Sequence, residues 1–124
     1  NLVGARLIGS VLRQADFTGA HMEMAFLINA DLRETNLRDA QLMRVNFKNA
    51  NLQGAILEGA ILGGAYLEDA DLRNALLAGA DLRWTNLELA KLEGAQLQGA
   101  KYDDRTRWPE EFDPAEAGAQ RMAG

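Results

Sequence analysis

The chain has 124 residues, no cysteine and a net charge of −5 at pH 7, and 48% of its residues are hydrophobic. This length is typical of one domain, and the lack of cysteine excludes disulfides and thiolate metal sites. No apolar run approaches the roughly 20 residues of a membrane-spanning helix, and no signal peptide is visible. We therefore expect a soluble, cytoplasmic protein with no membrane span.

From its first residues the chain repeats a five-residue unit of the form small, variable, large, variable, variable. The large position is Leu in seventeen of the first twenty units, and the small position two residues earlier is Ala in sixteen. A step of five residues turns a side chain by about 500° on an α-helix, which scatters the large residues around it. On a flat strand the same step alternates their faces. The chain must therefore turn within every unit, and the pattern predicts a solenoid.

The large side chains are predicted to point at one interior axis, because each unit stacks on an earlier one. At roughly 1.5–3 kcal/mol for each fully buried side chain, such a column is sufficient to order a regular backbone. The predicted core of the central coils is Leu32, Leu37, Leu42, Phe47, Leu52, Leu57, Leu62, Leu67 and Leu72.

The second position after each large residue indicates how the chain turns. Nine of the twelve glycines lie there, where a type II turn needs a positive φ. Asn29, Asn49 and Asn74 tolerate a positive φ next best. We expect a different turn in the units that place a bulkier residue in this slot, namely Gln14, Met24, Glu34, Arg44, Trp84 and Leu89.

The tandem motif Ala-Asp/Asn-Leu, as in 30–32, 50–52, 70–72 and 80–82, resembles the pentapeptide-repeat family over residues 1 to about 102. The resemblance implies an all-β fold, a right-handed quadrilateral β-helix with four units per coil. Twenty units would then form about five coils. Residues 1–102 would make up this β-helix, and residues 103–124 would form a C-terminal cap.

Nothing that resembles a cap precedes Asn1, and the chain does not start with Met. We expect this sequence to be part of a longer protein, with an uncapped first coil. An open solenoid end exposes unpaired strand edges. The first coil is therefore predicted either to fray or to associate with another molecule.

Stacking at twenty residues per coil would place Arg13, Arg33 and Arg73 in one outward column, beside a column that contains Asp31 and Asp71. The arginines could form an anion-binding stripe. The interleaved aspartates favour the alternative, a solvated face on which opposite charges offset one another.

A second outward region is unusually apolar. Exposed apolar patches can mark partner surfaces, although a folded-back tail or stacked aliphatic ladders would give the same pattern. We identify a candidate interaction surface for a protein partner at Met24, Phe26, Met43, Ile61, Tyr66, Trp84 and Leu89.

The segment from Tyr102 to Pro114 leaves the five-residue register. Its Tyr-x-x-x-Thr-x-Trp-Pro-x-x-Phe-Asp-Pro pattern resembles the closing segment found in the same family. Tyr102, Trp108 and Phe112 are the apolar residues available to cover the last coil. An Asp N-cap at 113, followed by Pro114, predicts a short α-helix over about 114–120. The residues after it are expected to fray.

No catalytic constellation is visible. His21 is the only histidine and lies at an outward position, and Ser10 is the only serine and occupies an inward slot. A convex rod offers no cleft that would exclude water or shift a pKa. We expect no enzyme activity, cofactor or metal site.

The sequence leaves two functional classes. The first is a non-enzymatic binding scaffold, a protein–protein interaction module that can belong to a longer chain. The alternative, implied by one branch of the resembling family, is a DNA mimic that inhibits DNA gyrase. That branch uses a strongly acidic rod, whereas residues 1–102 hold twelve acidic and ten basic residues. The scaffold is favoured, and we expect no nucleic-acid partner.

Overall fold

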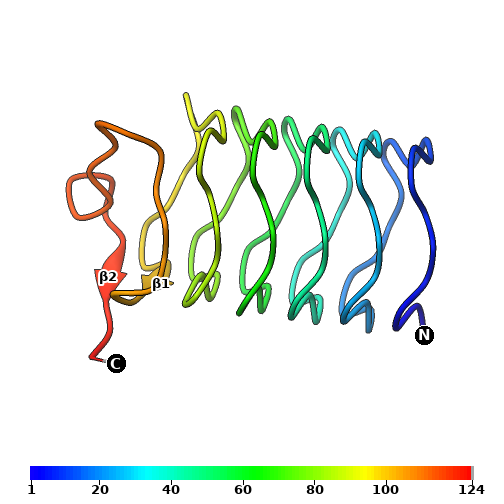
Figure 1. Ribbon diagram of the computed structural model, residues 1–124, viewed down its shortest axis with the longest axis horizontal. Helices are drawn as coiled ribbons and strands as arrows, with labels where there is room; N and C mark the ends of the chain where they lie inside the picture. The colour runs from blue at the N-terminus through cyan, green and yellow to red at the C-terminus, as the bar shows by residue number, and fades with distance from the viewer. Residues whose placement is uncertain (124) are drawn as a thin grey trace.

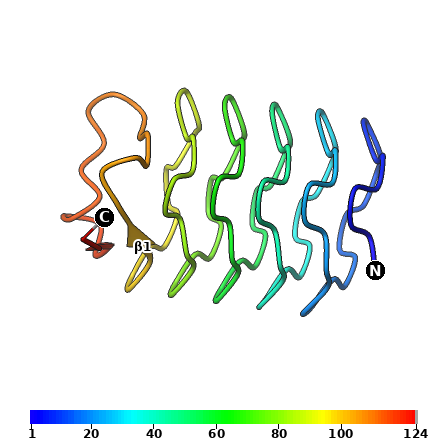
Figure 2. The same ribbon diagram turned by 60° about the horizontal axis from the view of Figure 1, so that its bottom comes forward.

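A computed structural model describes residues 1–123 as a β-helix solenoid, in which successive coils stack along the long axis of the molecule (Figure 1). Residue 124, the end of the predicted frayed tail, lies outside the described residues. Parallel bridges join residues twenty apart, such as Arg6 with Phe26 and Val11 with Asp31. Four five-residue units therefore make one coil, and the coils are seen edge-on in Figure 2.

Backbone hydrogen bonds tie every central coil to both of its neighbours. The N–H of Asn51 donates to the carbonyl of Ala30 at 2.9 Å, and the N–H of Leu52 donates to the carbonyl of Asp71 at 2.7 Å. Within the same unit, the N–H of Ala55 donates to the carbonyl of Leu52 at 3.0 Å and closes the turn. The backbone polar groups of this unit are thus satisfied without a long strand.

The turn has the same handedness in all twenty units, with φ between 57° and 76° at the second position after the large residue. Our expectation of a different turn at Gln14, Met24, Glu34, Arg44, Trp84 and Leu89 is therefore wrong, since their φ values are 57° to 64°. The neighbouring coil explains this result: the N–H of Met24, for example, donates to the carbonyl of Met43 at 3.0 Å. The stacking of coils imposes this left-handed conformation, although it raises the conformational energy of an L-residue by roughly 1–2 kcal/mol.

The interior holds the large and small columns that the sequence indicates. The nine predicted core residues, from Leu32 to Leu72, are at most 1% exposed. Thr85 occupies an inward small slot and donates its hydroxyl to the carbonyl of Leu62 at 2.9 Å. Thr106 does the same to the carbonyl of Leu82 at 2.8 Å, so the inward pattern continues past residue 102.

Three aromatic residues pack over the last coil. Tyr102 and Trp108 meet edge to face with ring centroids 5.6 Å apart, and Trp108 stacks on Phe112 at 5.1 Å. All three contact the hydrophobic core. They cover apolar surface that would otherwise face water at this end of the solenoid.

The predicted α-helix over about 114–120 is absent, and residues 1–123 contain no helix that could cross a membrane. The predicted N-cap does form, because the N–H of Glu116 donates to Oδ1 of Asp113 at 3.2 Å. Only one turn follows, since Gly118 at a φ of 91° ends it. A single turn does not offset the cost of helix nucleation, whereas pairing with the solenoid supplies other hydrogen bonds.

The predicted fraying after this turn is wrong for residues 120–122. Strand β2 (Gln120–Arg121) pairs in parallel with strand β1 (Lys101–Tyr102). The N–H of Gln120 donates to the carbonyl of Ala100 at 2.7 Å, and that of Met122 donates to Tyr102 at 2.6 Å. The exposed backbone edge of β1 provides these partners, which the sequence pattern does not reveal.

We predict that Leu87→Ala lowers the free energy of unfolding by about 2–5 kcal/mol, because Leu87 is 1% exposed and its truncation leaves a cavity. Leu89→Ala is the matched control: this leucine lies in the same unit, is 72% exposed and should change stability by less than about 0.5 kcal/mol. Urea denaturation of the two variants measures the difference. Equal losses would contradict the assignment of inward and outward positions.

Candidate functional site

Six of the seven candidate surface residues lie around one corner of the solenoid. Two neighbouring ladders flank it, one passing through Phe26, Asn46 and Tyr66 and the other through Gln41 and Ile61. The turns between these ladders carry the remaining members. We call this region the aromatic corner, made up of Met24, Phe26, Met43, Ile61, Tyr66 and Trp84.

Leu89 is not part of this corner. It follows the Asn86 bridge and lies on the next turn along the coil. Its turn stacks with those of Asp69 and Asn49, twenty and forty residues earlier, which carry polar side chains. The structure thus separates Leu89 from the other six candidates.

Large apolar side chains at the aromatic corner are open to water. Trp84 is 55% exposed and Tyr66 is 45% exposed, and Met24, Phe26 and Met43 are also exposed. Their backbone is held by the ladders on both sides, so little ordering entropy would be lost on binding. A rigid exposed aromatic surface of this kind is suited to contact with a partner.

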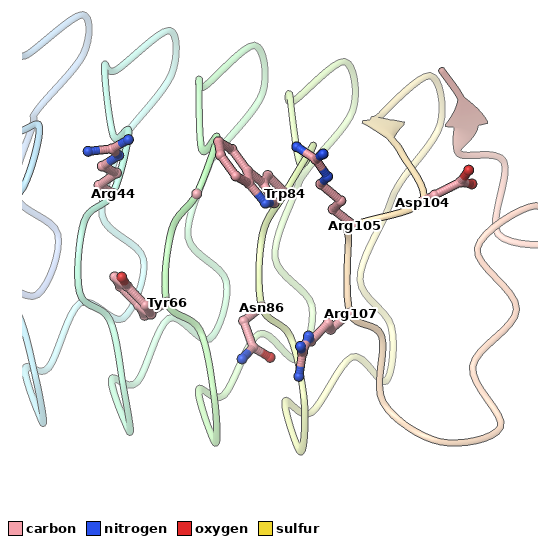
Figure 3. A pocket seen from close by; sticks show the side chains of 8 residues that line it. Arg44, Tyr66, Trp84, Asn86, Asp104, Arg105 and Arg107 are labelled. Carbon is pink, nitrogen blue, oxygen red and sulfur yellow. The ribbon is translucent and has the colours of Figure 1, made fainter. Parts of the chain in front are cut away.

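Beside Trp84 the corner is hollowed. A surface hollow of about 740 Å³ is lined by Arg44, Gly64, Tyr66, Trp84, Asn86, Asp104, Arg105 and Arg107. In Figure 3, Trp84 lies between Arg44 and Arg105, and Tyr66 lies below Arg44. A smaller adjoining hollow is lined in part by Met43, Ile61 and Gly63.

The hollow exists because two adjacent glycines occupy one turn of the corner. Gly63 and Gly64 follow the turn of Met43 and Arg44 by one coil and precede that of Arg83 and Trp84 by one coil. A Cβ at Gly63 would meet only the carbonyl oxygen of Arg83, at 3.8 Å. A Cβ at Gly64 would lie 3.3 Å from Cγ of Arg44, so the Arg44 side chain covers part of that glycine. The missing side chains leave a gap beside it, which we call the glycine notch.

Three arginines give the larger hollow a positive charge. Arg107 lies 3.4 Å from Glu88, whereas neither Arg44 nor Arg105 is within 4 Å of a carboxylate among residues 1–123. The guanidinium of Arg105 lies 5.2 Å from the ring centroid of Trp84, in a cation–π contact. The single lining carboxylate, Asp104, is paired with Arg121.

The arginine column considered from sequence has a different character. Nε and Nη2 of Arg33 donate to the two oxygens of Asp31 at 2.9 and 2.7 Å. Arg73 donates to both oxygens of Asp71 in the same bidentate way. Arg83 and Asp81 repeat this pair. These guanidinium groups are already satisfied by carboxylates, which favours a solvated, self-compensated face over an anion-binding stripe.

The pairs shift the pKa of the carboxylates. The hydrogen bonds from Arg73 lower the pKa of Asp71 from 3.8 to about 2, against the opposing effect of burial, and the amide of Gln53 adds to the lowering. Arg33 lowers the pKa of Asp31 to about 2 for the same reason. Both carboxylates are ionised at neutral pH, so neither is poised for proton transfer.

The remaining candidates for chemistry considered from the sequence are isolated side chains. His21 is exposed and lies 3.7 Å from Glu23. Within residues 1–123, no group of three or more His, Cys, Asp or Glu side chains is arranged to hold a metal ion.

Comparison with known proteins identifies related sequences and folds. The family profile for pentapeptide repeats matches residues 1–33, 27–64 and 65–101, in eight copies. No curated protein sequence matches the chain significantly. Among solved structures, a pentapeptide repeat protein from the Arabidopsis thaliana thylakoid lumen has 28% identity and a TM-score of 0.77, over 79% of this chain and 68% of its own.

Two further solved structures are similar. The pentapeptide repeat protein Rfr23 from the cyanobacterium Cyanothece 51142 has 30% identity and a TM-score of 0.53, over 83% of this chain and 87% of its own. A trypsin-treated form of QnrB1, a plasmid-mediated fluoroquinolone resistance protein, has 15% identity and a TM-score of 0.55, over 94% of this chain and 77% of its own. At that identity the likeness concerns the fold alone.

The sequence interpretation missed the basic part of the corner. Arg44, Arg105 and Arg107 were not among the candidate residues, because the last two lie beyond the regular repeats and reach the corner only through the closing segment. One signal was available: Gly63 and Gly64 are the only adjacent glycines in the chain.

We predict that the carboxyl group of Asp71 titrates with a pKa of about 2 in an NMR experiment, below its ordinary 3.8. Because the folded-state pKa is lowered, its stabilising contribution is present above pH 3.8 and is lost as the pH falls through about 2. Arg73→Gln should raise this pKa toward 3.8, whereas Arg33→Gln, which breaks the pair with Asp31, should leave it unchanged. A pKa near 3.8 in the unmodified protein would contradict the prediction.

Proposed function

The chain belongs to the pentapeptide-repeat family, and from that premise we propose that it is a non-enzymatic scaffold that binds a protein partner through the aromatic corner. The carrying observation is the cluster of exposed apolar side chains there, with Trp84 55% and Tyr66 45% exposed on a hydrogen-bonded backbone. Tyr and Trp anchors of this kind dominate the binding energy of many protein interfaces.

The shape of the surface supports binding rather than catalysis. The hollow beside Trp84 is an open depression on a convex rod, and its one lining carboxylate, Asp104, is paired with Arg121. A catalytic site needs a group held within reach of a reacting atom in a water-excluding cleft. A fixed array of side chains without such a cleft fits recognition.

We also infer the finer architecture of the solenoid. Bridges at a spacing of twenty residues are consistent with four faces per coil and thus with a quadrilateral cross-section. A right-handed helix of five coils over residues 1–102, closed by residues 103–124, is the proposal that the family resemblance supports.

The alternative, a DNA mimic that inhibits gyrase, is less well supported. A mimic must present unpaired negative charge to its target, but Asp31, Asp71 and Asp81 are each neutralised by an arginine of their own unit. The likeness to QnrB1 at 15% identity shows a common fold and no common target. We expect no salt-dependent competition with DNA for gyrase between about 50 and 200 mM salt.

A cytoplasmic location remains a prediction. The similar protein from Arabidopsis thaliana comes from the thylakoid lumen, so relatives of this chain occur in other compartments.

Site-specific photo-cross-linking tests the proposed function. With benzoylphenylalanine in place of Tyr66, we expect a discrete adduct with a protein partner in the host cell, and Trp84→Ala should remove it because it deletes the neighbouring anchor. The control position is Gln96, which is also exposed but lies on the ladder of Ile56 and Leu76. Adducts of equal yield at both positions, or none at either, would contradict the proposal.

We further propose that the first coil can associate with another molecule. Its large residues Leu2, Leu7, Leu12 and Phe17 are only partly buried, and its amides pair with one neighbouring coil. Hydrogen exchange across residues 5–20 should be faster than in the central coils when sedimentation shows a monomer, and should slow on self-association. Slow exchange in the monomer would remove the basis of this proposal.

A further inference from the structure

We infer that the glycine notch binds an acidic peptide segment that carries one aromatic side chain, and this inference rests on the proposed role of the aromatic corner in binding a protein. The aromatic side chain would enter beside Trp84, and the flanking carboxylates would meet Arg44 and Arg105. The notch thus defines the chemistry of the partner.

The apolar half of the notch can receive one ring. The turns of Arg44 and Trp84 are two coils apart, which corresponds to about 10 Å at the spacing of neighbouring strands. Between them the turn of Gly63 and Gly64 carries no side chain. Stacked or edge-to-face aromatic pairs need centroid separations of about 4.5–7 Å. The Arg44 side chain extends over Gly64, so a ring that packs against the exposed indole would enter between the indole and the aliphatic stem of Arg44.

The polar half of the notch favours a ligand with negative charge. Three arginines but only one carboxylate, that of Asp104, line the hollow. Asp104 already forms an ion pair with Arg121. Arg44 and Arg105 have no ion-pair partner among residues 1–123, although the chain as a whole carries a charge of −5. Arginine presents a planar fork that matches a carboxylate bidentately, as Arg73 does with Asp71 in this same protein.

The backbone at the notch is also unusual for a bulky residue. Trp84 has a φ of 64°, a region that large side chains seldom adopt, and its N–H donates to Oδ1 of Asp103 at 3.1 Å. The closing segment thereby fixes both Trp84 and Arg105, whose own N–H donates to the same oxygen at 3.0 Å. One carboxylate holds the aromatic and cationic parts of the notch in a fixed relation.

A peptide fits these observations better than single-stranded nucleic acid. Nucleic-acid binding uses a continuous basic groove along several nucleotides. Here the unpaired arginines flank one hollow, and the adjoining hollow is lined in part by the carboxylates Asp81 and Asp103. Only a short segment of negative charge meets favourable partners.

The experiment uses the two tryptophans as reporters. The indole N–H signals of Trp84 and Trp108 are followed by NMR during addition of acetyl-Glu-Glu-Phe-Glu-Glu-amide. We expect the Trp84 signal to shift and the Trp108 signal, which belongs to the aromatic cluster over the last coil, to stay. The Gln-for-Glu peptide and the Ala-for-Phe peptide should each bind at least about tenfold more weakly.

Three variants locate the binding. Gly63→Met should abolish binding without loss of thermal stability, because Met43 already occupies the equivalent position one coil earlier and Gly63 has no positive φ. Arg44→Gln should weaken binding about tenfold. Arg13→Gln is its matched control, since it removes an equal charge from an exposed arginine outside the notch and should leave binding unchanged.

Several results would overturn the inference: no shift of Trp84 at about 1 mM peptide, equal binding of the Gln-for-Glu peptide, undiminished binding to Gly63→Met, or tighter binding of a ten-nucleotide oligothymidine. These outcomes are separable from failure of the scaffold. If cross-linking at Tyr66 succeeds while the acidic peptide leaves Trp84 unshifted, the aromatic corner binds a protein of different chemistry. If cross-linking fails but the peptide binds as expected, the inference about peptide binding at the notch is supported and the scaffold proposal is contradicted.

Discussion

The parallel ladders, in which each residue stacks on the one twenty positions later, are the constraint on which the rest of the structure depends. Each central unit donates backward, as Asn51 does to Ala30, and forward, as Leu52 does to Asp71. These bonds fix where each coil lies on the next, and the leucine column then closes the interior. Neither the hydrogen bonds nor the leucine column would suffice alone, because an isolated coil would expose both its backbone edges and its core.

The same stacking explains why the protein can place unusual residues on its turns. All twenty turns hold a positive φ at the same position, even where the residue is Trp84 or Leu89. In an isolated peptide these residues would avoid that conformation. In the solenoid the ladder enforces it, and the outward side chain is free to vary. The turns can therefore carry varied side chains, and three members of the aromatic corner, Met24, Met43 and Trp84, lie on them.

Charge divides the surface into two kinds. On the outward ladder of Asp31 and Asp71 each carboxylate is held by the arginine two residues later, which lowers its pKa and leaves little net field. At the aromatic corner, Arg44 and Arg105 lack such partners among the described residues. Two residues before Arg44 lies the buried Leu42, and the Asp103 carboxylate two residues before Arg105 accepts from the backbone N–H groups of Trp84 and Arg105 instead. The proposed binding surface is thus a region where two arginines lack a carboxylate partner among residues 1–123.

The sequence by itself determined the repeat, the turn in every unit, the buried column from Leu32 to Leu72 and the apolar side chains of the corner. These follow from a five-residue period, which is a local property. The tertiary structure decided the rest: the left-handed conformation at Trp84, the strand Gln120–Arg121 in place of a frayed end, and the contact of Arg105 with Trp84. Each depends on hydrogen bonds or contacts between segments about twenty residues apart, and a pattern of neighbours along the chain does not contain them.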